Sequence, residues 1–235
     1  MIIHSFMWSY EREAVEISIK NLCHVVDYVV AVQATNTFRG HKREVSLLNI
    51  KGVTDIVVTI PNGLDPWESE KWLRDQTLIE AYNIFGNKSM YIISDGDEIP
   101  NSESIKEAAR LKKPTKLMTD YRNFYADWRA SDHILEHQPT VATYQDYMTV
   151  GGAGNARWHS NWTKSKEFGW HLSSLGNVSH LKLETFAHTE YDTEEYKKGL
   201  DESKKNHMDF LNRFKLEYTT DIPKGIPDKL LGGRI

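Results

Sequence analysis

The stretch "YIISDGDEIP" at residues 91–100 decides the fold, because an apolar run ends there in an acidic turn. Residues 91–93 are consecutively apolar, as in a strand buried on both faces of a parallel sheet. Three carboxylates then follow within four residues: Asp95, Asp97 and Glu98. In parallel α/β sheets, ligands bind beyond the carboxyl ends of the strands. The stretch therefore predicts a buried parallel strand and, at its end, a binding edge.

The first half of the chain alternates between strand and helix patterns. Runs of β-branched and apolar residues predict the strands, and apolar residues at helical spacing predict the helices. The predicted strands cover residues 1–7, 27–34, 55–60 and 89–95, and the predicted helices cover residues 9–26, 65–85 and 102–113. This alternation predicts a single α/β domain with a mostly parallel central sheet and helices on both faces.

The second half is less regular. It holds most of the tryptophans and a glycine-rich "GGAG" at residues 151–154. Short strand-like pieces are expected at residues 116–121, 141–148 and 169–175, and a polar helix is expected within residues 192–214.

Composition limits the classes of function. The 235 residues are 40% hydrophobic and 26% charged, which is typical of a globular protein. The single cysteine excludes an intramolecular disulfide framework, and the net charge of −4 argues against a general nucleic-acid surface. The N-terminus meets charge too early for a signal peptide, and no apolar run approaches the roughly 18 residues of a membrane span. We therefore expect a cytoplasmic protein without a membrane span.

The acidic turn suits a divalent cation. Asp95 and Asp97 are two residues apart, so their side chains can point the same way, with Gly96 allowing the backbone to bend between them. Two carboxylates held together favour protonation of one or a cation between them. Oxygen ligands favour Mg²⁺ or Mn²⁺, which would in turn bind a substrate diphosphate. The alternative is a solvated turn, since Asp, Gly and Pro all form turns readily.

Two further groups of charged residues are candidates for binding an anion. Glu70 and Arg74 are four residues apart on a predicted helix and can pair there, and an Arg guanidinium suits a diphosphate. The loop after the second predicted strand contains Arg39, His41 and Lys42, which could reach a phosphate or a base. A surface ion pair and a solvated basic loop are the alternatives.

Several segments together resemble glycosyltransferase family 17, the family of β-1,4-mannosyl-glycoprotein β-1,4-N-acetylglucosaminyltransferases. The segments occur in the same order along nearly the whole chain. They are "NLCHVVDYVVAVQATNTFRG" (21–40), "PWESEKWLRDQ" (66–76), "SDGDEIP" (94–100), "GWHLSSLG" (169–176), "KLETFAHTEY" (182–191) and "IPDKLL" (226–231). The sequence is closest in character to compact bacterial or viral members. It departs from the family at Gly96, where a bulkier residue is common, and the glycine could loosen the loop.

The resemblance implies a GT-A-like fold and an inverting, metal-dependent transfer of a sugar to a hydroxyl group. The expected donor is UDP-GlcNAc, the expected cofactor is Mn²⁺ or Mg²⁺, and the acceptor is a glycan or another hydroxyl compound. Within the single domain, residues 1–113 would bind the nucleotide-sugar, residues 114–191 would form the acceptor side, and residues 192–235 would form a helical tail.

The resemblance also suggests roles for individual residues. The metal ligands would be Asp95, Asp97 and His188. The donor-binding residues would be Arg74, Glu70, Arg39, Asp95, Trp170 and His171. The general base would be Glu190 or Glu184, with Asp127 and Asp132 as further candidates. Trp128, Trp158 or Trp170 could line a sugar pocket, although most aromatic residues of this region are expected in the core.

Two other functions are compatible with the same residues. A sugar nucleotidyltransferase also pairs carboxylates around a metal, but it usually has a glycine-rich loop after the first strand, and "HSFMWSYERE" (4–13) contains no glycine. A non-catalytic carbohydrate-binding protein could use a degenerate transferase fold, which the intact D-x-D motif and Arg74 argue against.

Overall fold

The computed structural model describes residues 1–130, 137–175, 179–209, 211 and 213–233. Its main feature is a seven-stranded sheet in the order β10-β6-β9-β4-β1-β2-β3. The strands of this sheet are β1 (Ile2–Met7), β2 (Tyr28–Ala34), β3 (Val53–Val58), β4 (Met90–Asp95), β6 (Thr115–Lys116), β9 (Thr140–Thr143) and β10 (Thr163–Lys164). Strands β3, β2, β1 and β4 are parallel neighbours, whereas β9 runs antiparallel to both β4 and β6.

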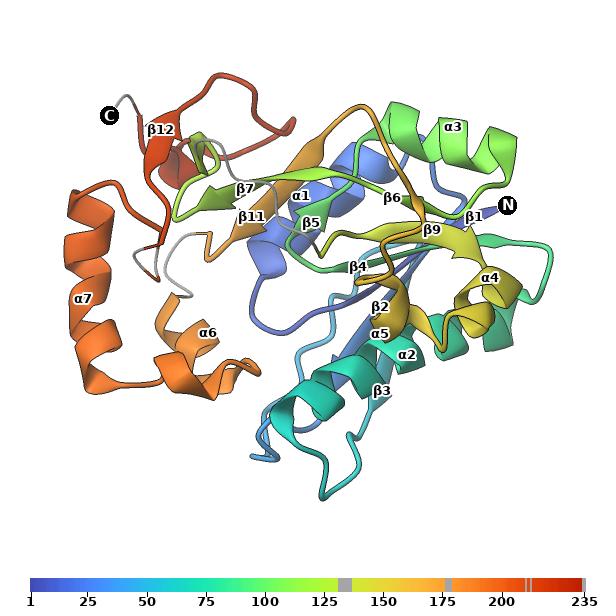
Figure 1. The fold of residues 1–235 in the computed structure, drawn as a ribbon, viewed down its shortest axis with the longest axis horizontal. Helices are drawn as coiled ribbons and strands as arrows, with labels where there is room; N and C mark the ends of the chain where they lie inside the picture. Colours follow the sequence, from blue (N-terminus) through green and yellow to red (C-terminus); the bar gives the residue numbers. More distant parts are fainter. Residues whose placement is uncertain (131–136, 176–178, 210, 212, 234–235) are drawn as a thin grey trace.

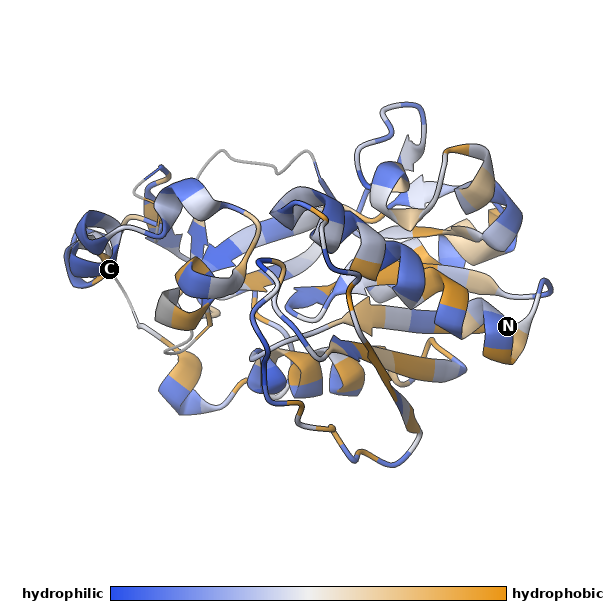
Figure 2. Ribbon diagram, turned by 90° about the horizontal axis from the view of Figure 1, so that it is seen from below, coloured by the Kyte–Doolittle hydropathy of each residue, from blue (hydrophilic) through white to orange (hydrophobic). Residues whose placement is uncertain are grey.

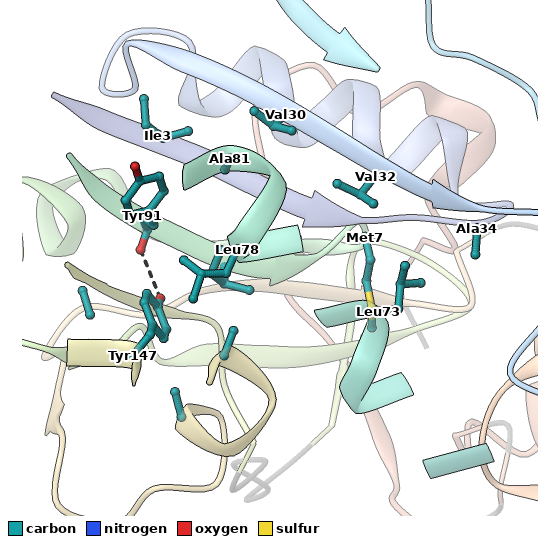
Figure 3. Close-up of a cluster of buried hydrophobic side chains, with 14 of the residues drawn as sticks. Ile3, Met7, Val30, Val32, Ala34, Leu73, Leu78, Ala81, Tyr91 and Tyr147 are labelled. Atoms are coloured by element: carbon teal, nitrogen blue, oxygen red, sulfur yellow. Dashed lines mark hydrogen bonds between the residues drawn. The ribbon is translucent and has the colours of Figure 1, made fainter. Parts of the chain in front are cut away.

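Helices cover both faces of this sheet, as the sequence predicts. Helix α2 (Pro66–Phe85) packs on one face, and α1 (Arg12–Leu22) and α3 (Ser102–Leu111) pack on the other (Figure 1). Figure 3 shows the core under α2, where Leu73, Leu78 and Ala81 meet Ile3 and the inner side chains of β2. The mostly parallel α/β architecture is therefore confirmed.

A capping box explains why α2 begins where it does. The Asp65 carboxylate accepts hydrogen bonds from the backbone N–H groups of Trp67 and Glu68, and the Glu68 carboxylate accepts one from the N–H of Asp65. Pro66 at the first helical position lacks an N–H that would otherwise be unpaired. Both signals come from neighbouring residues, so they can be read from the sequence. They fix the start of the helix that carries Arg74.

A second, five-stranded sheet has the order β12-β8-β7-β11-β5. Its strands are β5 (Glu98–Ile99), β7 (Thr119–Asn123), β8 (Trp128–Ala130), β11 (Gly169–Ser173) and β12 (Leu216–Tyr218). The remaining elements are α4 (Tyr144–Thr149), α5 (Ala153–Ala156), α6 (Ser179–Thr185), η1 (Thr189–Tyr191), α7 (Glu194–Lys205) and η2 (Asp228–Leu230). Figure 2 shows hydrophobic residues concentrated in the central strands, while α7 is largely hydrophilic.

The strand expected over residues 141–148 is correct only as far as Thr143. Strand β9 ends at Thr143, and α4 follows directly. The reason is a second capping box, in which Thr143 and Asp146 cap each other's backbone N–H groups.

In the part of the chain described, no helix is long and apolar enough to span a membrane.

A buried histidine in β1 should make stability depend on pH. His4 is 0% exposed, and its Nε2 lies 2.9 Å from Ser94 Oγ. Burial lowers the pKa of His4 from 6.5 to about 3, so the folded protein holds it neutral. The unfolded chain binds the proton first, so stability is lost as the pH falls from 6.5 towards 3. At pH 5 the loss from His4 alone should be about 2 kcal/mol.

Urea unfolding at pH 7, 6 and 5 measures this effect, with His4→Gln as the comparison variant. The variant should show a shallower decline in stability than the wild-type protein. Some decline should remain, since burial also lowers the pKa of His137 to about 3. Equal slopes for the two proteins would contradict the assignment.

Candidate functional site

The acidic turn lies at the carboxyl edge of the parallel strands, as the sequence predicts. Asp95 is the last residue of β4 and pairs in register with Met7, the last residue of β1. Glu98 begins β5 three residues later, so the turn joins the seven-stranded sheet to the five-stranded sheet.

Gly96 is required in this turn by close packing. A Cβ atom at this position would lie 2.8 Å from both Trp8 Cβ and Val15 Cγ2. The glycine therefore lets the turn sit against α1 and the loop after β1, rather than loosening it.

Gly96→Ala is expected to destabilise the protein by about 1–3 kcal/mol, because the methyl group overpacks this contact. Chemical denaturation measures the change. Gly199→Ala in α7 is the control, since among the described residues no atom lies within 4 Å of the added Cβ. That control should be neutral or stabilising, by up to about 1 kcal/mol. Equal stability of Gly96→Ala and the wild-type protein would contradict the packing argument.

Two arginines neutralise the first half of the acidic turn. Arg74 Nη2 donates to Asp95 Oδ1 at 2.9 Å, and Arg157 Nη2 donates to Asp95 Oδ2 at 3.1 Å. Arg157 also donates two hydrogen bonds to Glu98, at 2.6 and 2.9 Å. Burial alone would raise the pKa of Asp95, but Arg157 and Arg74 lower it to about 2. Asp95 is therefore a carboxylate at neutral pH.

Lys182 and His171 face the second half of the turn. Lys182 Nζ donates to Asp97 Oδ2 at 2.8 Å, and His171 Nε2 lies 3.6 Å from Asp97 Oδ1. Burial opposes ionisation of Asp97, but Lys182 and His171 more than offset it and hold its pKa well below the ordinary value. The turn thus has protein cations on both sides.

This arrangement does not fit a divalent ion without rearrangement. Both oxygens of Asp95 accept guanidinium hydrogen bonds, and Asp97 Oδ2 accepts the ammonium of Lys182. In the described ranges, no group of three or more His, Cys, Asp or Glu side chains is arranged to hold a metal. His188, the predicted third ligand, instead places Nδ1 2.7 Å from Glu190 Oε1. Metal binding by Asp95, Asp97 and His188 stays a prediction.

A pocket of about 200 Å³ opens over the acidic turn. Its floor comes from the ends of β1, β2 and β4, and its walls come from α2, β7, β11 and the segment that begins with α6. The charged and histidine side chains that line it are Glu11, Arg43, Glu70, Asp95, Asp97, His137, Arg157, His171, Lys182, His188 and Arg213. The pocket is therefore polar at the turn and has cations on several walls.

The structure brings many of the predicted site residues together. Glu70, Asp95, Asp97, His171 and His188 all line the pocket. Arg74 is 3% exposed and lies behind the lining. Its guanidinium donates one hydrogen bond to Glu70 Oε1 at 3.0 Å and another to Asp95, and so links these two residues.

Other predicted site residues lie outside the lining. Arg39 pairs with Asp192 and donates to the Leu183 carbonyl at 2.9 Å, so it ties the loop after β2 to the α6 segment. Trp170 packs against the core beneath α1 and α3. Glu190 pairs with His188, as described above.

The remaining described candidates for a general base or for a surface that stacks on a sugar also lie outside the pocket lining. Glu184 pairs with Lys197 on the surface. Asp127 accepts the backbone N–H groups of Gly232 and Gly233, at 2.7 and 2.9 Å, and therefore anchors the C-terminal segment. Trp128 donates to the Gly233 carbonyl, and Trp158 is 58% exposed outside the pocket lining. Asp132 lies outside the described residues.

Sequence reasoning missed Arg157 and Lys182. Arg157 follows α5, the short helix of the "GGAG" stretch, and Lys182 lies on α6 within the "KLETF" stretch. The acidic turn itself predicts that such cations exist, because buried carboxylates need positively charged partners. The identity of those cations could not be read, since both lie far from the turn in sequence.

No protein-family model matches the chain, and no curated protein matches it. Among solved structures, the chain is similar to the bifunctional IspDF from Campylobacter jejuni, with a TM-score of 0.36 and 11% sequence identity. The similarity covers 71% of this chain and 48% of that one, so the chain matches about half of the length of that protein.

Proposed function

We propose that this protein is a glycosyltransferase of the family 17 type, which moves a sugar from a nucleotide-sugar to a hydroxyl acceptor. One observation carries the proposal: five separate segments on which the family resemblance rests all supply residues to one pocket. They contribute Asn36 to Phe38, Glu70 and Leu73, Asp95 to Asp97, His171 and Ser173, and Lys182 to His188 in part. If these segments resembled the family only because they form a hydrophobic core, we would not expect all five to supply residues to one cavity.

The chemistry of the pocket supports this proposal. Its carboxyl-edge position is where α/β sheets bind nucleotide ligands. Cationic groups next to the D-x-D turn suit a donor whose leaving group is a diphosphate. We propose UDP-GlcNAc as the donor and inversion at the anomeric carbon, following the family resemblance.

The acceptor hydroxyl needs a general base. Glu184 and Glu190 are outside the pocket lining, whereas Glu70 lies within it, and its Oε1 accepts a hydrogen bond from the same Arg74 Nη2 that donates to Asp95. A base must come within hydrogen-bond reach of the proton that it removes. We therefore propose Glu70 as the general base in preference to Glu184 and Glu190, the two glutamates predicted from the sequence.

The test is a screen of nucleotide-sugars for breakdown by the purified protein, with products identified by mass spectrometry. Release of free UDP, from UDP-GlcNAc above all, is the expected result. Release of pyrophosphate would instead indicate a sugar nucleotidyltransferase. No turnover and no binding of UDP by calorimetry would favour a carbohydrate-binding protein.

A further inference from the structure

Lys182 is placed unusually for a surface-helix lysine. Its side chain is only 18% exposed and reaches from α6 into the pocket at the D-x-D turn. The ammonium donates to Asp97 Oδ2 at 2.8 Å and to Ser173 Oγ at 3.1 Å. Three elements therefore fix one cation: the turn after β4, the end of β11 and α6.

The ammonium of Lys182 lies directly beside a carboxylate, since its Nζ is 2.8 Å from Asp97 Oδ2. A lysine ammonium has three N–H donors. The hydrogen bonds found for Lys182 within the described residues use two of them, which leaves one donor for a ligand in the pocket.

The position of this ammonium matches the task of a metal ion. In a metal-dependent transferase, the carboxylates of the D-x-D turn hold a cation that faces the donor diphosphate. Here a protein cation already occupies one oxygen of Asp97, and Arg74 and Arg157 occupy both oxygens of Asp95. Arg43 and Arg213 add positive charge to the pocket lining.

We propose that Lys182 takes the place of the divalent ion and binds the diphosphate of the donor, so that donor cleavage needs no metal. The inference rests on the proposed function. In the transfer, the bond between the anomeric carbon and the diphosphate oxygen breaks, and its electron pair stays on that oxygen. The acceptor oxygen bonds to the anomeric carbon and gives its proton to a pocket carboxylate. Lys182 stabilises the diphosphate as its negative charge develops.

The experiment measures UDP release from UDP-GlcNAc and UDP binding by calorimetry, each in excess EDTA and in added Mn²⁺. The wild-type protein should show rates and affinities within about twofold of each other in the two conditions. In EDTA, Lys182→Met should bind UDP at least about tenfold more weakly, and Lys182→Arg should recover part of the loss. Lys198→Met, an exposed lysine on α7, should behave as wild type. Circular dichroism confirms that each variant is folded.

Loss of UDP release and UDP binding in EDTA, with recovery in Mn²⁺, would overturn the inference while leaving the proposed function intact. Unchanged UDP affinity of a folded Lys182→Met in EDTA would also overturn it. If no nucleotide-sugar is cleaved in either condition, the proposed function fails, and calorimetry then tests whether Lys182 binds a diphosphate. UDP binding in EDTA that depends on Lys182 would support this role of Lys182, and absence of such binding would refute it.

Discussion

Glu98→Ala is expected to lower the free energy of unfolding by about 3–5 kcal/mol, the cost of removing one partner of a buried ion pair. Glu98 is 0% exposed and accepts two hydrogen bonds from Arg157, which is itself buried. Its Oε2 also accepts the backbone N–H of Asp95 at 2.8 Å. The substitution would leave both donors without this acceptor and would also create a cavity. Urea denaturation followed by circular dichroism measures the change.

Glu103→Ala is the matched control for this variant. Glu103 pairs with Lys106 on the surface of α3, where its side chain is 72% exposed. Exposed ion pairs contribute about 0–1 kcal/mol, so the control should be close to wild type. A loss of less than about 1 kcal/mol for Glu98→Ala would mean that the buried network does not stabilise the fold as described.

On the proposed function, Asp97→Asn is expected to lower kcat/KM for donor breakdown by at least about 100-fold, comparable to the loss of one fixed charge-stabilising group in an enzyme active site. The amide keeps the shape of the side chain but removes the charge that holds Lys182 and faces His171. The measurement is UDP release at several concentrations of UDP-GlcNAc.

Asp201→Asn, on the exposed face of α7, is the control and should retain full turnover. Thermal unfolding of both variants separates lost chemistry from lost structure. Wild-type turnover by a folded Asp97→Asn protein would contradict a role for the D-x-D turn in donor breakdown.

Local patterns were sufficient to predict the strands and helices of the first half, except for the two-residue strand β5. The apolar run before Asp95, and Pro66 with Gly86 at the two ends of α2, are signals carried by neighbouring residues. Strand β9 shows the limit, because its apolar pattern continues into α4, and only the capping box at Thr143 ends it.

The partners of the acidic turn could not be predicted in the same way. Arg157 lies 59 residues from Glu98, and Lys182 lies 85 residues from Asp97. Such pairs depend on how the two sheets and α6 come together, and no periodicity in the sequence records that. The carboxylates were readable because they are adjacent in sequence, whereas their counter-ions became visible only in three dimensions.

The turn that ends β4 and begins β5 has a consequence for protein engineering. Since five residues close one sheet and open the other, the two sheets cannot be exchanged independently at this point without rebuilding Asp95, Glu98 and Arg157 together. A chimera with its junction in the exposed segment after α3, at Lys112 and Lys113, would keep Asp95 and Glu98 together, and the part beyond the junction would still have to supply an arginine at the position of Arg157.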